Sequence, residues 1–180
     1  IDSIDEIDFC ESVLYNKYKP EYTSLSDSIK LLLITRYFMH YTYEYKWMHN
    51  NLPILSIKQY LKLKKGTCIS FATIFIYIAT RYNIITQYVS NPQHAWNSVI
   101  YNNKAHNLDM THWCKTKNSY YKSKPYHLWE IFITPGYDYK LIEFNKELYD
   151  EIIKPKAYND KIIGYAGTTP YQFTIIRKDE

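Results

Sequence analysis

Apolar residues in the first half of the chain recur at the spacing of α-helices. The acidic opening segment places apolar side chains at about this period: Ile4, Ile7, Cys10 and Leu14. Ser24 and Asp27 then form a pair that is typical of a capped helix start. The helix that follows is predicted from positions with a period of about 3.6. Its inward positions are Ile29, Leu32, Leu33, Arg36 and Tyr37.

Two further helices are predicted before residue 83. Residues 41–45 alternate and indicate extended chain, and Ser56 with Gln59 three positions later forms a second capping pattern. Gly66 is expected to end that short helix as its C-terminal glycine. Residues 68–79 are then apolar on nearly every side, which predicts a central buried helix that stops near Asn83.

The second half of the chain favours strands. They are predicted over residues 84–89, 94–101, 104–110, 128–134, 139–144 and 172–176. Asn102-Asn103 suits a tight hairpin turn with positive φ, and Pro135-Gly136 indicates a second hairpin. Helices precede antiparallel strands, so the predicted fold class is α+β.

Composition narrows the class of protein. A length of 180 residues fits one domain, 1–180, and 46% apolar with 18% aromatic residues excludes intrinsic disorder. A net charge of +4 without a basic stripe argues against nucleic acid as a partner. The longest apolar run is shorter than the ~20 residues of a membrane span. The 21 tyrosines indicate codon bias in an AT-rich genome more than a Tyr-lined binding surface.

The start of the chain gives a localisation hypothesis. It begins at Ile1 without Met and shows no signal peptide. We therefore expect a mature form or an excised domain, and a secreted or cell-surface protein.

The chain holds three cysteines, Cys10, Cys68 and Cys114, so at least one thiol has no partner within the chain. A cysteine on an apolar helix is usually an inert buried thiol. Cys68, however, follows Gly66-Thr67 at the first turn of its helix. Unpaired backbone N–H groups and the helix dipole favour a thiolate at that position.

The hairpin predicts a partner for His94. If the hairpin closes at residues 102–103, three pairs of residues lie opposite one another: Tyr101 with Lys104, Trp96 with Asp109, and His94 with Thr111. His94 and Asp109 are then diagonal neighbours on one face, ~7–8 Å apart at the backbone, within reach of a side-chain hydrogen bond. Such a carboxylate holds an imidazole in the tautomer that a general base needs.

These residues together resemble the transglutaminase-like superfamily. The resemblance rests on Gly66-Thr67-Cys68 opening an apolar helix, on His94-Ala95-Trp96-Asn97, and on Asp109 fifteen residues after the histidine. It covers about residues 26–114, with 115–180 expected as a β-rich completion. The segment after the acid departs from the family's usual D-P-T-W by lacking proline and having one extra residue. Ala105 and Ser98 replace an aromatic residue and a glutamate that are common in the family.

The resemblance implies a papain-like fold with a Cys-His-Asp triad. Cys68 would be the nucleophile, His94 the general base and Asp109 the orienting carboxylate. The implied reaction is attack of Cys68 on an amide of a protein or peptide substrate, which gives a thioester that water or an amine resolves. Cross-linking, deamidation and proteolysis all remain open within this class.

Supporting roles are predicted for four more side chains. The oxyanion hole needs two donors, of which one is the Cys68 backbone N–H. Trp47 and Gln59 are candidates for the other. Trp96 and Trp113 are candidates for the walls of a substrate groove.

The sequence leaves two alternatives to this enzyme. His106, His112 and Cys114 supply three metal-ligand types, but their spacing matches no zinc motif, and no acidic loop suits calcium. No metal or cofactor is therefore expected. The second alternative is a non-catalytic binding module that uses a Tyr-rich face. The chain retains all three triad residues, whereas such modules typically lose the cysteine or the histidine.

Overall fold

A computed structural model describes residues 3–15, 17, 19–44, 57–90, 94–116, 124–125 and 127–132. The helices are α1 (Glu6–Glu11), the 3-10 turn η1 (Ser12–Tyr15), α2 (Pro20–Thr23), α3 (Asp27–Phe38), α5 (Ile57–Leu63), α6 (Cys68–Arg81), α7 (Met110–Trp113) and α8 (Leu128–Ile131). The strands are β1 (Thr42–Tyr43), β2 (Lys65–Gly66), β3 (Thr86–Ser90), β4 (Ala95–Tyr101) and β5 (Lys104–Leu108).

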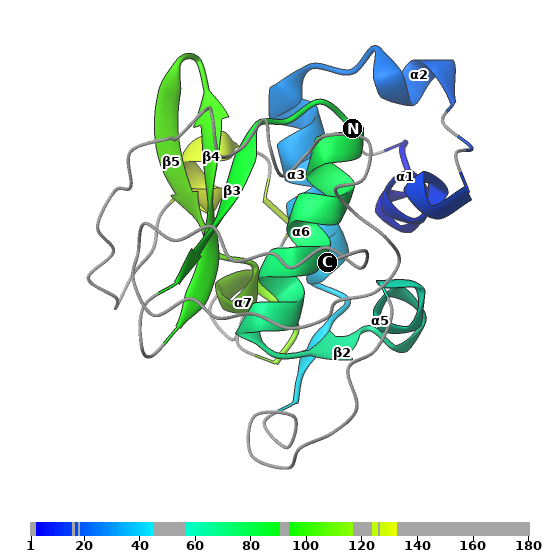
Figure 1. Ribbon diagram of the computed structural model, residues 1–180. Helices are drawn as coiled ribbons and strands as arrows, with labels where there is room; N and C mark the ends of the chain where they lie inside the picture. The colour runs from blue at the N-terminus through cyan, green and yellow to red at the C-terminus, as the bar shows by residue number, and fades with distance from the viewer. Residues whose placement is uncertain are drawn as a thin grey trace, which may run out of the picture.

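Helices and a small antiparallel sheet pack into two layers around α6. The sheet has the order β3-β4-β5 and lies against one side of α6, while α3 and α5 pack on it from other directions (Figure 1). β1 and β2 form a separate two-stranded parallel pair. The predicted α+β class is confirmed. Within the described residues, no helix has the length and apolar character needed to cross a membrane.

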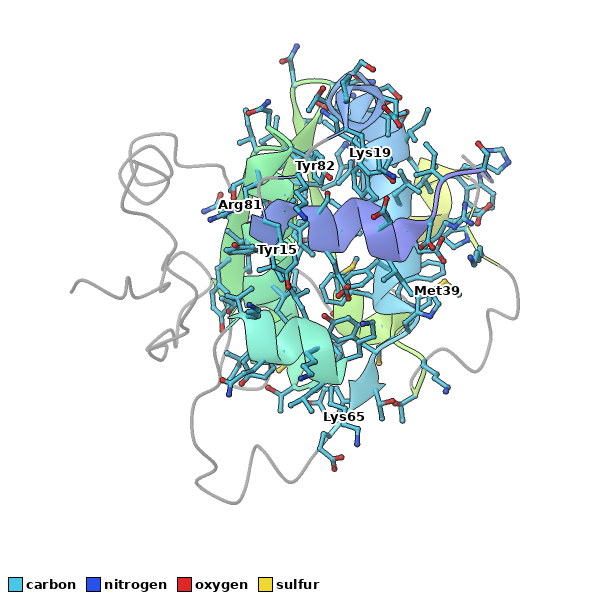
Figure 2. All side chains as sticks on the ribbon, turned by 90° about the vertical axis from the view of Figure 1, so that its right-hand side faces the viewer. Tyr15, Lys19, Met39, Lys65, Arg81 and Tyr82 are labelled. Carbon is cyan, nitrogen blue, oxygen red and sulfur yellow. The ribbon has the colours of Figure 1, made fainter. Side chains whose placement is uncertain are left out.

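Helix α6 is the buried centre of the fold, as its sequence predicted. All of its residues from Ser70 to Ala79 are buried, because apolar side chains surround the helix. Lys65 lies in β2, just before the helix, and Arg81 is its last residue; Figure 2 labels Lys65 near the bottom of the view and Arg81 higher up on the left. Asn83 follows with φ 62°, which agrees with its predicted role as the stop.

The start of α3 corrects one prediction. The N-cap is Ser26, whose Oγ accepts a hydrogen bond from the backbone N–H of Ile29 at 3.4 Å. Ser24 instead ends the preceding helix α2, with its hydroxyl bonded to Glu21, and Asp27 is the first residue of α3. Because α2 begins at Pro20 and uses Ser24 as its C-cap, the N-cap of α3 lies two residues later, at Ser26.

Gly66 has a different role from the one expected. Helix α5 ends at Leu63, and Lys64 takes the left-handed conformation with φ 53°. Gly66 lies two residues further on, in β2, where it pairs with Tyr43. The extended chain predicted over residues 41–45 is confirmed at β1. Ser56, the predicted start of α5, lies outside the described residues.

The hairpin of β4 and β5 has the predicted register. Tyr101 pairs with Lys104, and the ladder continues to Asn97 with Leu108. Asn102 and Asn103 both have positive φ, at 51° and 62°, as a two-residue turn of this kind requires.

The strand predicted over residues 128–134 is wrong for its first four residues, which form α8. One helical turn brings Leu128 and Ile131 onto the same side, where both pack against the core, and leaves Trp129 65% exposed. A strand would have turned Leu128 and Ile131 to opposite faces. The strands predicted over residues 139–144 and 172–176 lie outside the described residues.

The N-terminal helix is fixed by a buried carboxylate. Glu6 is 4% exposed and lies 3.6 Å from Arg36, 3.1 Å from His40 and 2.5 Å from Lys124. These three partners come from α3, from the turn after it and from the segment before α8. Glu6 therefore joins three parts of the chain that are distant in sequence.

Candidate functional site

Cys68 is the first residue of α6 and is 4% exposed. The helix start is held by a capping box in which the Ser70 hydroxyl accepts from the Thr67 backbone N–H at 2.8 Å. A Cβ at position 66 would lie 2.7 Å from that hydroxyl, so the close approach requires glycine. Gly66, Thr67 and Ser70 thus fix the backbone on both sides of Cys68.

His94 and Asp109 are bonded to one another. The imidazole Nε2 lies 2.8 Å from Oδ2 of Asp109, and the two side chains are 11% and 2% exposed. The other carboxylate oxygen, Oδ1, accepts from the backbone N–H of Thr111 at 3.0 Å. Asp109 is thereby the N-cap of α7, and that short helix holds the carboxylate in place.

The hairpin register accounts for this contact, but the predicted strand was too long. β5 ends at Leu108 and not at Met110, so Thr111 lies in α7 and is not a ladder partner of His94. The diagonal relation between His94 and Asp109 persists beyond the last ladder pair. The predicted contact between their side chains is therefore present.

The pKa of His94 is raised to about 10. Burial alone would lower it, because desolvation disfavours the imidazolium. Hydrogen bonds to Asp109 and to Cys68, and the charges of these two groups, outweigh burial. The imidazole thus stands between Cys68 and Asp109, and it is charged near neutral pH.

The segment after Tyr41 joins the two ends of the site, which the sequence did not reveal. On one side the backbone N–H groups of Thr42 and Glu44 donate to the carbonyls of Lys64 and Gly66, each at 2.9 Å. On the other side Tyr41 accepts from the Lys115 N–H at 2.8 Å. β1 therefore lies between the chain leading to Cys68 and the chain that follows Asp109.

Asn97 connects β4, the strand that directly follows His94, to the helix of Cys68. Its side-chain amide donates to the Ala72 carbonyl of α6 at 3.1 Å, and the residue is fully buried. A polar side chain at an inward position of a strand was the available signal in the sequence. The bond holds β4, which begins directly after His94, against α6, which begins at Cys68.

Both tryptophans proposed for a groove are buried. Trp96 is 2% exposed, and its indole N–H donates to Oδ1 of Asn107 at 3.1 Å. Its ring stacks on that of His94, with 5.7 Å between centroids and 19° between planes. Trp113 is 1% exposed and belongs to the main core. Their assignment to a groove stays a prediction.

The two oxyanion candidates also stay predictions. Gln59 is exposed on α5, the helix that leads through β2 to Cys68. Trp47 lies outside the described residues. The backbone N–H of Cys68 stands in the first turn of α6, where N–H groups lack partners within the helix.

No three His, Cys, Asp or Glu side chains converge as a metal site within the described residues. The His106 ring stacks on Phe132, with 4.3 Å between centroids. His112 lies in α7, where burial lowers its pKa, and Cys114 is fully buried just after it. No disulfide joins Cys10, Cys68 or Cys114.

Known proteins give little support for placing this chain in a family. No protein-family model matches the chain, and no curated protein matches it in sequence. A solved structure described as the crystal structure of a TGase is similar to it with a TM-score of 0.40 and 15% sequence identity. That comparison covers 97% of this chain and 44% of the solved chain, so this chain spans less than half of that chain's length. This degree of similarity does not assign the chain to a family.

Proposed function

We propose that the protein is a cysteine-dependent acyl transferase or hydrolase that acts on amide bonds of protein or peptide substrates. The observation that carries the proposal is the His94–Asp109 bond of 2.8 Å beside Cys68 at the start of α6. A nucleophile, a base and a carboxylate that orients the base are the three parts that thiol acyl transfer requires.

The roles of the two histidine nitrogens follow from this geometry. Asp109 engages Nε2, which leaves Nδ1 as the nitrogen that can exchange a proton with Cys68. In the proposed reaction the Cys68 thiolate attacks the amide carbonyl, and the C–N bond breaks as the imidazolium donates its proton to the departing amine. The product is a thioester on Cys68 and a neutral His94.

The second half of the proposed reaction restores the enzyme. Neutral His94 takes a proton from water or from a primary amine as that molecule attacks the thioester, and Cys68 leaves as the thiolate. Water gives hydrolysis and an amine gives transfer. The Cys68 backbone N–H, with Trp47 or Gln59 as candidates for a second donor, would stabilise the oxyanion in both halves.

The sequence resemblance supports a transglutaminase-like, papain-like arrangement as the finer form of this proposal. Gly66-Thr67-Cys68, His94-Ala95-Trp96 and Asp109 carry that resemblance. Residues 1–180 would then form a single domain with its core at about 26–114. Cross-linking or deamidation of glutamine side chains is the favoured reaction within this proposal, and proteolysis by the same residues is the alternative.

One incubation tests the proposal and separates its forms. The chain is mixed with a Gln- and Lys-rich protein and a labelled primary amine, and the products are read by mass spectrometry. Amine incorporation indicates transfer, a one-dalton gain per glutamine indicates deamidation, and fragments indicate proteolysis. Cys68→Ala is expected to abolish whichever product appears, while the matched Cys114→Ala retains it. Activity that survives Cys68→Ala would refute the mechanism, and no product with any substrate would favour the binding module.

A further inference from the structure

Two successive side-chain pairs on the β4–β5 hairpin are arranged in the same way. His94 bonds to Asp109, and Trp96, two residues along β4, bonds to Asn107, two residues back from Asp109. Each ring bonds through one edge nitrogen to a side-chain oxygen that lies diagonally across the hairpin, Oδ2 of Asp109 for His94 and Oδ1 of Asn107 for Trp96. His94 directly precedes β4 and Asp109 directly follows β5, so the first pair lies just beyond the ladder. The two rings stack on one another, which places them on the same side of the hairpin.

The two rings stack at 5.7 Å between centroids and 19° between planes, a range in which aromatic pairs attract. The bonds to Asp109 and Cys68 hold His94 by its edge, and a ring held at its edge still turns about the line through those contacts. The face of Trp96 restrains the plane of the ring. An indole face also favours the charged form of the imidazole.

Trp96 is itself restrained. Asn107 accepts the indole N–H at 3.1 Å, and Trp96 packs with Val89 in a small cluster separate from the main core. Ser98, the ladder partner of Asn107, lies on the same face. Asn107 therefore fixes Trp96, and Trp96 fixes the plane of His94.

We infer that Trp96 and Asn107 act together as positioning residues for His94. This inference rests on the proposed function, because it concerns the orientation of the proposed base. Asn107 contacts neither Cys68 nor Asp109 in the hydrogen bonds of the site, and it acts through Trp96. The sequence alone does not single out Asn107, since its role depends on the diagonal contact.

The test measures how fast iodoacetamide alkylates Cys68 in the full chain at pH 7. The extent of alkylation is read by mass spectrometry of the peptide that contains Cys68. Asn107→Leu removes the acceptor, and Trp96→Phe keeps an aromatic ring without the N–H. Each is expected to lower the rate of alkylation about fivefold, the factor that corresponds to the free energy of one neutral hydrogen bond. The combined variant is expected to be no slower than either single variant, because both remove the same bond.

Two matched variants separate positioning from general damage to the hairpin. Asn107→Asp keeps an acceptor oxygen in the same place and is expected to restore the rate to within about twofold of the wild type. Ser98→Ala removes a buried hydroxyl without a hydrogen-bond partner in the described structure, opposite Asn107, and is expected to leave the rate unchanged. If Asn107→Leu does not fold, Trp96→Phe and Asn107→Asp still decide the question. With an amide substrate, Trp96→Phe should lower kcat and leave KM unchanged.

The outcomes distinguish this inference from the proposed function. His94→Ala is expected to slow alkylation of Cys68 more than any of these variants. If His94→Ala slows it but Trp96→Phe and Asn107→Leu do not, the positioning inference alone is overturned. Multiplying effects in the combined variant would also overturn it. If His94→Ala leaves the rate unchanged, the proposed function and the inference fail together.

Discussion

The imidazole of His94 lies 2.8 Å from the carboxylate of Asp109, fifteen residues away in sequence, and both side chains are nearly excluded from solvent. Neither charge would be stable in this place alone, because a buried ion that loses its partner retains the full cost of desolvation. The pair therefore serves stability and the proposed chemistry together, and substitution of Asp109 can separate the two.

Asp109→Ala should destabilise the fold by about 3 kcal/mol, because it removes the carboxylate partner of His94 and the N-cap of α7. Asp109→Asn should cost less, because an amide oxygen still accepts from the Thr111 N–H. The same Asn variant should slow turnover by ~10²-fold or more, since it no longer holds the correct tautomer. Urea unfolding and turnover of an amide substrate measure the two effects. Equal losses of stability for Ala and Asn would argue against the capping role.

The raised pKa of His94 predicts a loss of stability at alkaline pH. The imidazole has a pKa of about 10 in the folded chain and about 6.5 when unfolded. Its contribution is therefore complete below about pH 6.5, declines as the pH rises, and is lost once the pH passes about 10. The melting temperature of the wild type should fall more steeply between pH 7 and 10 than that of His94→Gln. Parallel curves of melting temperature against pH for the two proteins would contradict the raised pKa of His94.

The lowered pKa of Glu6 predicts the opposite pH dependence, a loss of stability in acid. Burial alone would raise its pKa, but hydrogen bonds from Lys124 and His40 and the charge of Lys124 lower it to about 2 from the usual 4.5. Its contribution is complete above about pH 4.5 and is lost as the pH falls through about 2. Glu6→Gln should be less stable at pH 7 and should unfold with a weaker dependence on pH between 5 and 2. Glu21→Gln, at an exposed position on α2, is the matched control and should follow the wild type.

Gly66→Ala tests the close packing next to Cys68. The added Cβ would lie 2.7 Å from the Ser70 hydroxyl and 2.9 Å from the Ser70 Cβ, so the first turn of α6 has to shift. Overpacking of this kind costs about 1–3 kcal/mol. Chemical denaturation should show that loss together with slower alkylation of Cys68, whereas Lys65→Ala, at the exposed neighbouring position, should change neither. A Gly66→Ala variant as stable and reactive as the wild type would contradict the structural role of this glycine.

The parts of the fold that the sequence predicted correctly depend on strong local signals. Helix α6 is apolar on nearly every side, and Asn102-Asn103 permits positive φ at two adjacent positions, so both elements were predicted within a few residues. The hairpin register then followed from the turn, and the contact between His94 and Asp109 followed from the register.

The parts that were missed depend on contacts between distant segments. Leu128 and Ile131 adopt a helical turn because both pack on the core, and their sequence suits a strand equally well. The sequence predicts Gly66 as a helix end, whereas pairing with β1 and the proximity of Ser70 determine its place. The bond from Asn97 to Ala72 joins two elements whose relative position the sequence does not specify.

In the proposed mechanism, His94 activates Cys68 as a nucleophile. The most direct test is the rate at which iodoacetamide alkylates each cysteine at pH 6, followed by peptide mass spectrometry in the wild type and in His94→Ala. Cys10 and Cys114 are fully buried, and burial raises the pKa of Cys10 well above its usual range. Cys68 should react at least about tenfold faster than either, and His94→Ala should remove this advantage. Equal rates at the three cysteines, or a fast Cys68 in His94→Ala, would contradict it.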